Sequence, residues 1–233
     1  MKKFGLLGGL SWLSTIDYYR ELNMAVNQHF KSNINPRLYV VNLNQKEIHD
    51  LQKAGDWQKI SHILIETGRE LESLGCEGLA FCANTPHRVY EDVQDKMDIP
   101  ILHIGDAVGR YIRKIGHKKV GLLGTRYTME GDFIRSRLEN LYSVEVVIPE
   151  QEPRRKIQTL LYQEMSRGLF SDEARNYFLQ LIEELKSKGA EAAVLGCTEF
   201  PILLNHIDTA LPKIDSMMCH VDDIAKFILE QEQ

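Results

Sequence analysis

The sequence lacks several features that would assign it to particular classes of protein. No hydrophobic run reaches the roughly 20 residues that a membrane-spanning helix needs. No long basic run is present and the formal net charge is −5, so nucleic acid is not an expected partner. Residues 1–9 begin like a signal peptide, but glycines and Trp12 interrupt the apolar run too early. We therefore expect a cytoplasmic protein with no membrane partner and no nucleic-acid partner.

Signatures of metal and nucleotide binding are missing as well. The four cysteines show no CxxC spacing and no histidine partner at zinc-finger spacing, so we expect free thiols and no metal site. An apolar segment followed by Gly8 and Gly9 suggests a strand and a glycine-rich turn, but no GxGxxG pattern and no P-loop lysine follow. We expect no cofactor, and we interpret the glycines as allowing the backbone to approach a small ligand closely.

One stretch combines a predicted strand with reactive side chains. The apolar run from Ala192 to Leu195 predicts a buried parallel strand, and Cys197, Thr198 and Glu199 follow it. In open α/β sheets, ligands bind beyond the carboxyl ends of the strands. Cys197 is therefore a candidate catalytic residue, although a small buried cysteine that only packs is the alternative. Glu199 either orients the Cys197 loop or caps the following helix.

A second stretch repeats the first. Residues 70–82 align without a gap with residues 184–196: Glu70, Leu71, Ser73, Gly75 and Glu77 match Glu184, Leu185, Ser187, Gly189 and Glu191. Continuing in register, Ala83 falls opposite Cys197 and Asn84 falls opposite Thr198. The two halves therefore present equivalent strand ends, of which only one carries a cysteine at the equivalent position.

The repeat extends over nearly the whole chain, because residues 2–9 also match residues 118–125. We interpret it as a twofold duplication of one α/β unit. The expected domains are 1–104 and 105–210, with a strand and helix in 211–233 that return to the first domain. A helix is expected from about Ile16, with Ser14 or Thr15 as its N-cap.

Two equivalent strand ends suit chemistry on two faces of one carbon. A racemase needs an acid/base group on each side: one removes the α-proton and the other returns a proton. Thiols can serve, because a modest environmental shift brings a cysteine near neutral pH as thiolate. Backbone N–H groups, asparagine and threonine at the strand ends would bind carboxylates and a developing enolate.

Four motifs resemble those of the aspartate/glutamate racemase family. They are Leu-Gly-Gly-Leu-Ser-Trp-Leu-Ser-Thr at 7–15, Ala-Asn-Thr-Pro-His at 83–87, Leu-Leu-Gly-Thr-Arg-Tyr-Thr-Met at 122–129 and Gly-Cys-Thr-Glu at 196–199. The resemblance implies a cofactor-independent amino-acid racemase, usually a homodimer. It also implies an α/β fold with two pseudo-symmetric Rossmann-like or flavodoxin-like domains, parallel sheets and the active site in the cleft between the domains.

The resemblance also suggests roles for individual residues. Cys197 matches the second catalytic cysteine, and Asn84 and Thr85 match a carboxylate-binding turn. The remaining candidates for binding the amino-acid or carboxylate substrate are Leu10, Ser11, Gln52, Thr125, Thr128, Thr198 and Glu199.

The sequence departs from the family pattern at two positions. Ala83 stands where the first catalytic cysteine is expected, and Cys82 lies one residue earlier, where a strand would point it away from the site. Ser166 stands where many members carry a lysine for a substrate carboxylate, with basic residues nearby at 154–156 and 167. Three hypotheses follow: a racemase that acts by thiol-based proton transfer, a single-cysteine decarboxylase or isomerase, and a non-catalytic carboxylate-binding protein.

Overall fold

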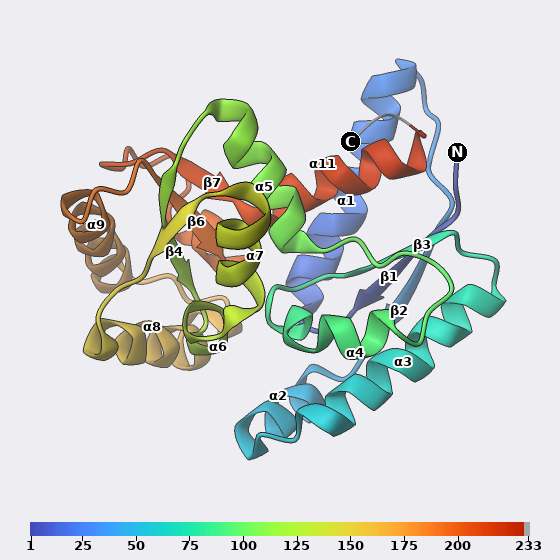
Figure 1. Cartoon of the computed structure of the whole chain (residues 1–233), viewed down its shortest axis with the longest axis horizontal. Helices are drawn as coiled ribbons and strands as arrows, with labels where there is room; N and C mark the ends of the chain where they lie inside the picture. Colours follow the sequence, from blue (N-terminus) through green and yellow to red (C-terminus); the bar gives the residue numbers. More distant parts are fainter. Residues whose placement is uncertain (231–233) are drawn as a thin grey trace. The chain divides into compact units, whose positions relative to one another are not determined.

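The computed structural model describes residues 1–230, which divide into two compact units (Figure 1). The first unit consists of Met1–His103 and the segment from His220 onward, and the second consists of Ile104–Cys219. Each unit is built on its own parallel sheet with helices on both faces, so the expected α/β class with two parallel sheets is confirmed.

The first unit contains a three-stranded sheet with the order β2-β1-β3. Leu79 adds an isolated parallel bridge to Ile101. The elements of this unit are β1 (Phe4–Gly8), α1 (Trp12–Phe30), β2 (Leu38–Asn42), α2 (Gln45–Ala54), α3 (Trp57–Ser73), β3 (Gly78–Phe81), the 3-10 helix η1 (Thr85–Val89), α4 (Tyr90–Gln94) and most of α11 (Ser216–Ile228).

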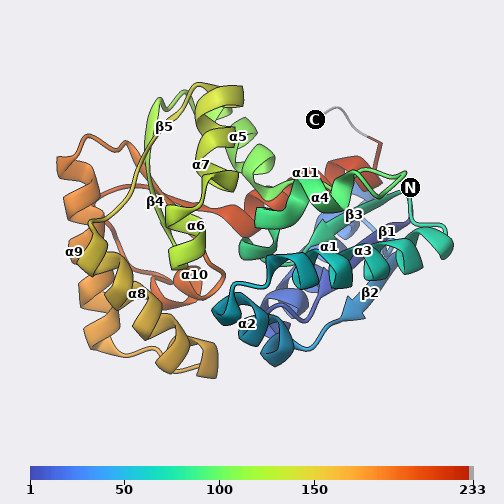
Figure 2. The same cartoon turned by 60° about the horizontal axis from the view of Figure 1, so that its bottom comes forward.

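Helices cover both faces of this sheet because its central strands are apolar on both sides. On one face, Leu64 and Leu71 of α3 pack in one core with Leu79 and Phe81 of β3. On the other face, the Phe4 ring meets the Phe227 ring of α11, with 5.7 Å between the ring centroids. Figure 2 shows α3 and α2 lying along one side of the β1–β3 sheet.

The second unit contains a four-stranded parallel sheet with the order β5-β4-β6-β7. Its elements are α5 (Ile104–Ile115), β4 (Lys119–Gly124), α6 (Arg126–Glu130), α7 (Asp132–Tyr142), β5 (Glu145–Val147), α8 (Gln151–Gln163), the 3-10 helix η2 (Met165–Arg167), α9 (Asp172–Ser187), β6 (Ala192–Gly196), α10 (Glu199–Leu203) and β7 (Lys213–Asp215).

Successive side chains of the central strands enter different cores. In β6, Leu195 packs with residues of α8 and α9, such as Leu161 and Phe178. Its neighbour Val194 packs on the opposite face with α5 and α7. The alternation follows from strand geometry, in which consecutive side chains point to opposite faces of the sheet.

The sequence repeat corresponds to a repeat of hydrogen bonds. The backbone N–H of Leu79 donates to the carbonyl of Pro100 at 2.9 Å, and that of Ala193 donates to the carbonyl of Pro212 at 2.9 Å. The carboxylate of Glu77 accepts from the backbone N–H of Lys3 at 3.0 Å, and the equivalent Glu191 accepts from that of Lys119 at 2.9 Å. The strand ends that follow β3 and β6 are therefore structurally equivalent.

The C-terminal segment differs from our expectation for 211–233. Its strand, β7, pairs with β6 and so belongs to the second unit. The division between the units then falls within α11, since Cys219 groups with the second unit and His220 with the first. Residues 231–233 of this expected segment lie outside the described residues.

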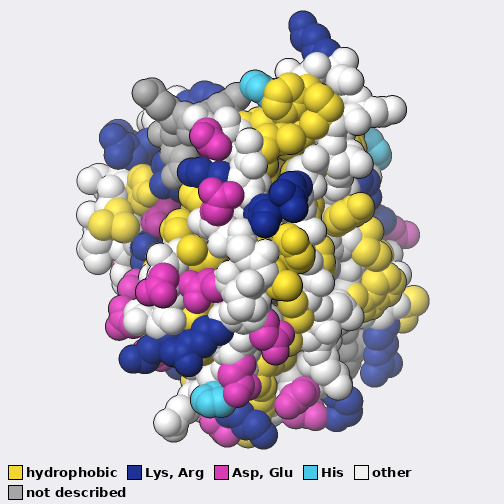
Figure 3. Space-filling model, turned by 90° about the vertical axis from the view of Figure 1, so that its right-hand side faces the viewer, with side chains coloured by type: hydrophobic (Ala, Val, Ile, Leu, Met, Phe, Trp, Pro, Cys, Tyr) yellow, Lys and Arg dark blue, Asp and Glu magenta, His cyan; other side chains and the backbone are white. Residues whose placement is uncertain are grey.

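The surface carries apolar side chains among charged ones, as Figure 3 shows for one face. Trp12, Ile16 and Tyr19 are exposed on α1 at the spacing of one helix face, and Val40 is exposed on the edge strand β2. Within residues 1–230, no helix combines the length and apolar character that crossing a membrane requires. The expected homodimer stays a prediction.

Candidate active site

The glycine-rich turn after β1 holds two of the expected substrate-binding residues, Leu10 and Ser11. Gly9 has a φ of +73°, and a Cβ there would lie 2.2 Å from the carbonyl oxygen of Leu43, so only glycine fits. Ser11 is the N-cap of α1, and its Oγ accepts from the backbone N–H of Ser14 at 3.4 Å. The expected cap at Ser14 or Thr15 was therefore wrong, since both lie within the first turn of the helix.

The turn after β3 lies beside the turn after β1, because β1 and β3 pair in parallel and Leu7 is opposite Phe81. The Oγ of Ser14 donates to the carbonyl of Cys82 at 2.7 Å and links the two turns. Asn84 and Thr85 are buried here, and Ala83 is partly exposed. Gln52 is buried on α2, whose Ile48 packs in the same core as Leu10.

A buried histidine supports the 83–85 turn from behind. The Nδ1 of His87 lies 3.0 Å from the carbonyl oxygen of Ala83 and 3.2 Å from that of Asn84. Carbonyl oxygens only accept, so Nδ1 carries a proton. This arrangement makes His87 part of the scaffold of the turn, which agrees with a structural role rather than that of a base.

Cys82 is fully buried, unlike the neighbouring position 83. Burial raises the pKa of the Cys82 thiol far above its ordinary value, because no nearby charge compensates the desolvation of a thiolate. Because its side chain is fully buried, Cys82 offers no surface at which a substrate could meet the thiol.

In the second unit, the turn after β4 lies beside the turn after β6. Gly124 and Gly196 are directly opposite in the paired strands. Thr125 caps α6 by accepting from the backbone N–H of Thr128 at 3.1 Å, and the two threonine hydroxyl oxygens lie 3.0 Å apart. A Cβ on Gly124 or Gly196 would press against the methyl-bearing side of Thr128, so these glycines allow that side chain to lie against both strand ends.

Cys197 donates a hydrogen bond from its thiol to the carboxylate of Glu199, with 2.9 Å between Sγ and Oε2. The Thr198 hydroxyl donates to the same oxygen at 3.1 Å. Glu199 is buried, whereas Cys197 is partly exposed. Burial, together with the negative charge of Glu199, raises the pKa of the Cys197 thiol well above its usual range. The resting group is thus a thiol with a carboxylate acceptor, able to give up a proton to a substrate carbanion.

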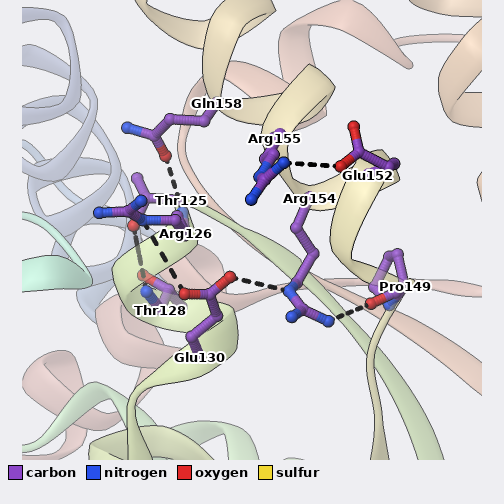
Figure 4. Close-up of polar contacts among 9 residues, drawn as sticks. All are labelled: Thr125, Arg126, Thr128, Glu130, Pro149, Glu152, Arg154, Arg155 and Gln158. Atoms are coloured by element: carbon purple, nitrogen blue, oxygen red, sulfur yellow. Dashed lines mark hydrogen bonds and ion pairs between the residues drawn. The ribbon is translucent and has the colours of Figure 1, made fainter.

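The helix α8 contributes two polar side chains, Tyr162 and Gln158, next to the turns of Arg126 and Cys197. Tyr162 packs against the same apolar core as Cys197, and its phenol forms a hydrogen bond with Gln158. Gln158 also accepts from the backbone N–H of Arg126 at 2.7 Å (Figure 4). Sequence patterns gave no signal for these contacts, because α8 is far from both strand ends along the chain.

The structure thus groups the expected residues into two sets. In the first unit, Leu10, Ser11, Asn84 and Thr85 lie at the carboxyl edge of one sheet; in the second, Thr125, Thr128, Thr198 and Glu199 surround the carboxyl end of β6 with Cys197. Within residues 1–230, no group of three or more His, Cys, Asp or Glu side chains is placed to hold a metal ion.

We expect Glu199→Gln to make Cys197 more reactive toward iodoacetamide. Removing the carboxylate charge lowers the thiol pKa, so more thiolate is present at a given pH; at pH 8 we expect a rate increase of about tenfold. The rate in the unsubstituted protein should rise steadily with pH beyond 9, since its thiol pKa is raised. Mass spectrometry would assign the modified residue, with buried Cys82 as the internal control. A slower reaction in Glu199→Gln would contradict this account of the Cys197 environment.

The chain is similar to known racemases over most of its length. A family model described as Asp/Glu/Hydantoin racemase matches residues 7–224. A Yersinia pestis crystal structure assigned to the Asp/Glu racemases shares 35% identity, covering 98% of this chain and 100% of that chain, with a TM-score of 0.92. An aspartate racemase homologue from Pyrococcus horikoshii shares 33% identity, covering 98% and 100% of the two chains, with a TM-score of 0.83.

A broad specificity amino-acid racemase of Bacillus subtilis is 27% identical over 166 residues, which is 70% of this chain and 70% of that protein. The family model spans both strand-end turns, including the Ala83 and Cys197 positions. With its two parallel-sheet units and its match to the family model along almost its entire length, the chain belongs to the Asp/Glu/Hydantoin racemase family.

Proposed function

We propose that the protein is an amino-acid racemase-type isomerase that transfers the α-proton through the thiol of Cys197. The observation that carries this proposal is the 2.9 Å hydrogen bond from the Cys197 thiol to buried Glu199 at the end of β6. A thiol in this position can protonate a carbanion, and its thiolate can remove an α-proton. Family membership supports the reaction class, and the Bacillus subtilis relative is described as a broad specificity amino-acid racemase.

In this proposal, polar groups at the strand ends stabilise the charge that develops during proton transfer. Removing an α-proton moves negative charge onto the carboxylate of the substrate, and preorganised donors lower the free energy of that state. Thr198 and Thr125 are placed at the two strand ends of the second unit, next to Cys197 and Gly124. Asn84 and Thr85 hold the equivalent place in the first unit.

The reaction is tested by following the α-proton of each amino acid in D₂O by proton NMR, with chiral analysis of the same samples. Loss of the α-proton signal in the presence of the protein, with appearance of the opposite enantiomer, would support a racemase. If no amino acid in a panel of both enantiomers lost its α-proton, the proposal would be refuted and a carboxylate-binding protein would be favoured.

A second candidate, a single-cysteine decarboxylase or isomerase acting on one face, is favoured by one observation. Position 83 carries only a methyl group, although the hydrogen-bond repeat makes it equivalent to position 197. A single acid would protonate an enediolate on one face only. Exchange with retention but without inversion, or release of CO₂ from a malonate-type substrate, would distinguish this candidate.

We expect α-proton exchange to continue unchanged in the presence of EDTA and after extensive dialysis. The proposed steps use only a thiol, a carboxylate and hydrogen-bond donors from the chain itself. Exchange rates measured before and after dialysis against excess chelator would check this. Loss of exchange that added metal or pyridoxal phosphate restored would refute a cofactor-independent reaction.

A further inference from the structure

Arg126 is a partly exposed cation in the turn after β4, beside the turn that carries Cys197, because Gly124 and Gly196 are opposite each other in the paired strands. The proposed chemistry does not use it. Arg126 directly follows Thr125 at the end of β4, and its side chain is 51% exposed. Its Nε lies 3.9 Å from the carboxylate of Glu130, at the outer limit for an ion pair. Figure 4 shows that contact and the shared position of Glu130 between two arginines.

Glu130 is bound more closely by the second of these arginines. The Nε of Arg154 lies 3.0 Å from Glu130, and its Nη1 donates to the carbonyl of Pro149 at 2.7 Å. Arg154 is also less exposed, at 18%, so this contact is less screened by water than the contact to Arg126. Two guanidinium groups thus share one carboxylate, which leaves a net positive charge on the Arg126 side.

The other basic residues near the expected lysine position, 166, are either paired with an acidic side chain at a shorter distance than Arg126 or exposed to solvent. Arg155 pairs with Glu152 at 2.7 Å, and Lys156 lies 3.7 Å from Glu173. Ser166, at the lysine position itself, donates its hydroxyl to the carbonyl of Tyr162 at 3.1 Å. Arg167 is exposed on η2.

Tyr162 lies on α8 with Gln158, which accepts from the backbone N–H of Arg126 at 2.7 Å. Tyr162 also packs against the same apolar core as Cys197. Burial, the largest cause, raises the pKa of Tyr162 to about 12, so the phenol keeps its proton and can donate it to an anion. Gln158 forms hydrogen bonds with the Tyr162 phenol and with the backbone N–H of Arg126. These two contacts hold the start of α6 against α8.

We propose that Arg126 is the specificity-determining residue for the substrate side chain, binding its carboxylate while Cys197 addresses the α-carbon, with Tyr162 as a second donor. This inference rests on the proposed function for the position of the α-carbon. A carboxylate gains a charge-assisted hydrogen bond from a guanidinium that Glu130 only partly neutralises. An uncharged side chain of the same size gains much less, so the site selects anionic side chains.

The test measures binding rather than turnover, so that it remains informative if no proton transfer occurs. The full chain with Cys197→Ala is titrated by calorimetry with aspartate, glutamate, asparagine and glutamine. We expect Arg126→Gln in this background to raise the Kd for aspartate and glutamate by about 10- to 100-fold, and for the two amides by less than about threefold. Arg126→Lys should recover part of the loss, because it keeps the charge without the planar fork.

Three further variants sharpen the test. Arg155→Gln, an exposed arginine of the same region, is the matched control and should leave every Kd unchanged. Arg167→Gln should also have no effect. Glu130→Gln should act in the opposite direction and tighten aspartate and glutamate binding by about 2- to 5-fold, because it removes the competing carboxylate. Thermal unfolding of each variant would verify that it folds, as expected for a half-exposed position.

Several results would overturn the assignment of Arg126. One is a Kd for aspartate and glutamate that Arg126→Gln leaves unchanged, and another is a Kd that this variant raises equally for the acidic amino acids and their amides. A loss of affinity in Arg167→Gln instead of Arg126→Gln, or no binding of any of the four ligands, would also overturn it. Selective binding that depends on Arg126, without α-proton exchange in the unsubstituted protein, would retain this inference while refuting the proposed reaction.

Discussion

Replacing Cys197 with alanine is expected to abolish α-proton exchange. A positioned general acid/base contributes on the order of 10²–10⁴-fold to a rate, and the proposed reaction assigns this role to the Cys197 thiol at the end of β6. Because the thiol acts in the transition state, the loss should appear in kcat rather than in KM alone. Proton NMR in D₂O with the best amino-acid substrate gives the rate directly.

The interpretation requires that Cys197→Ala stays folded. Cys197 is partly exposed at a strand end, so removing one sulfur atom creates little cavity, and the circular dichroism spectrum and Tm should stay close to those of the unsubstituted protein. Cys76→Ala is the matched control: Cys76 is buried in the core of the first unit, and this variant should keep its exchange rate. Exchange that persisted undiminished in Cys197→Ala would place the acid/base group elsewhere.

The second large effect is expected from Ala83→Cys, which should raise the rate at which an enantiomer is inverted relative to the rate at which its α-proton exchanges with solvent. The matching hydrogen bonds of Leu79 to Pro100 and of Ala193 to Pro212 place position 83 in the same register as Cys197. In the proposed reaction, the alanine at this position leaves one acid/base face, so the α-proton of one enantiomer should exchange with retention faster than that enantiomer is inverted. A second thiol could raise inversion by as much as roughly 10²–10⁴-fold.

The side chain added in Ala83→Cys should be tolerated, since Ala83 is partly exposed and a thiol adds little volume. The measurement is the ratio of the rate of inversion, from chiral chromatography, to the rate of deuterium incorporation, from NMR. Cys82→Ala should change neither rate, because the Cys82 side chain is fully buried. Loss of inversion in Cys82→Ala together with no gain in Ala83→Cys would show that Cys82 is the first acid/base group.

Much of the fold was predictable because it depends on local patterns and on the repeat. The apolar runs at 4–7, 78–82 and 192–195 correspond to β1, β3 and β6 within one residue at each end. The helix α5 was not predicted. Its buried face combines small and large apolar residues in a segment with glycines at 105 and 109, and Gly109 is needed because the Tyr142 ring packs against it.

Helix starts were less predictable than strands. Ser11, Ser14 and Thr15 all carry hydroxyl groups near the start of α1, and from the sequence each of them could cap it. The structure selects Ser11, because Ser14 is used to bind the carbonyl of Cys82 and Thr15 accepts from the backbone N–H of Gly9 at 2.9 Å. Tertiary contacts with the β3 end therefore decided which residue caps the helix.

The sequence by itself determined the two-unit α/β plan, the parallel strands and the position of Cys197 and Ala83 at equivalent strand ends. These follow from apolar patterns and from a register that the chain repeats. Only the tertiary structure decided that the Glu199 carboxylate turns toward the Cys197 thiol, that Tyr162 from α8 packs against the same core as Cys197, and that Arg126 shares Glu130 with Arg154. Such contacts depend on how helices pack on the sheet and on which rotamers that packing allows, and no local pattern of residues encodes either.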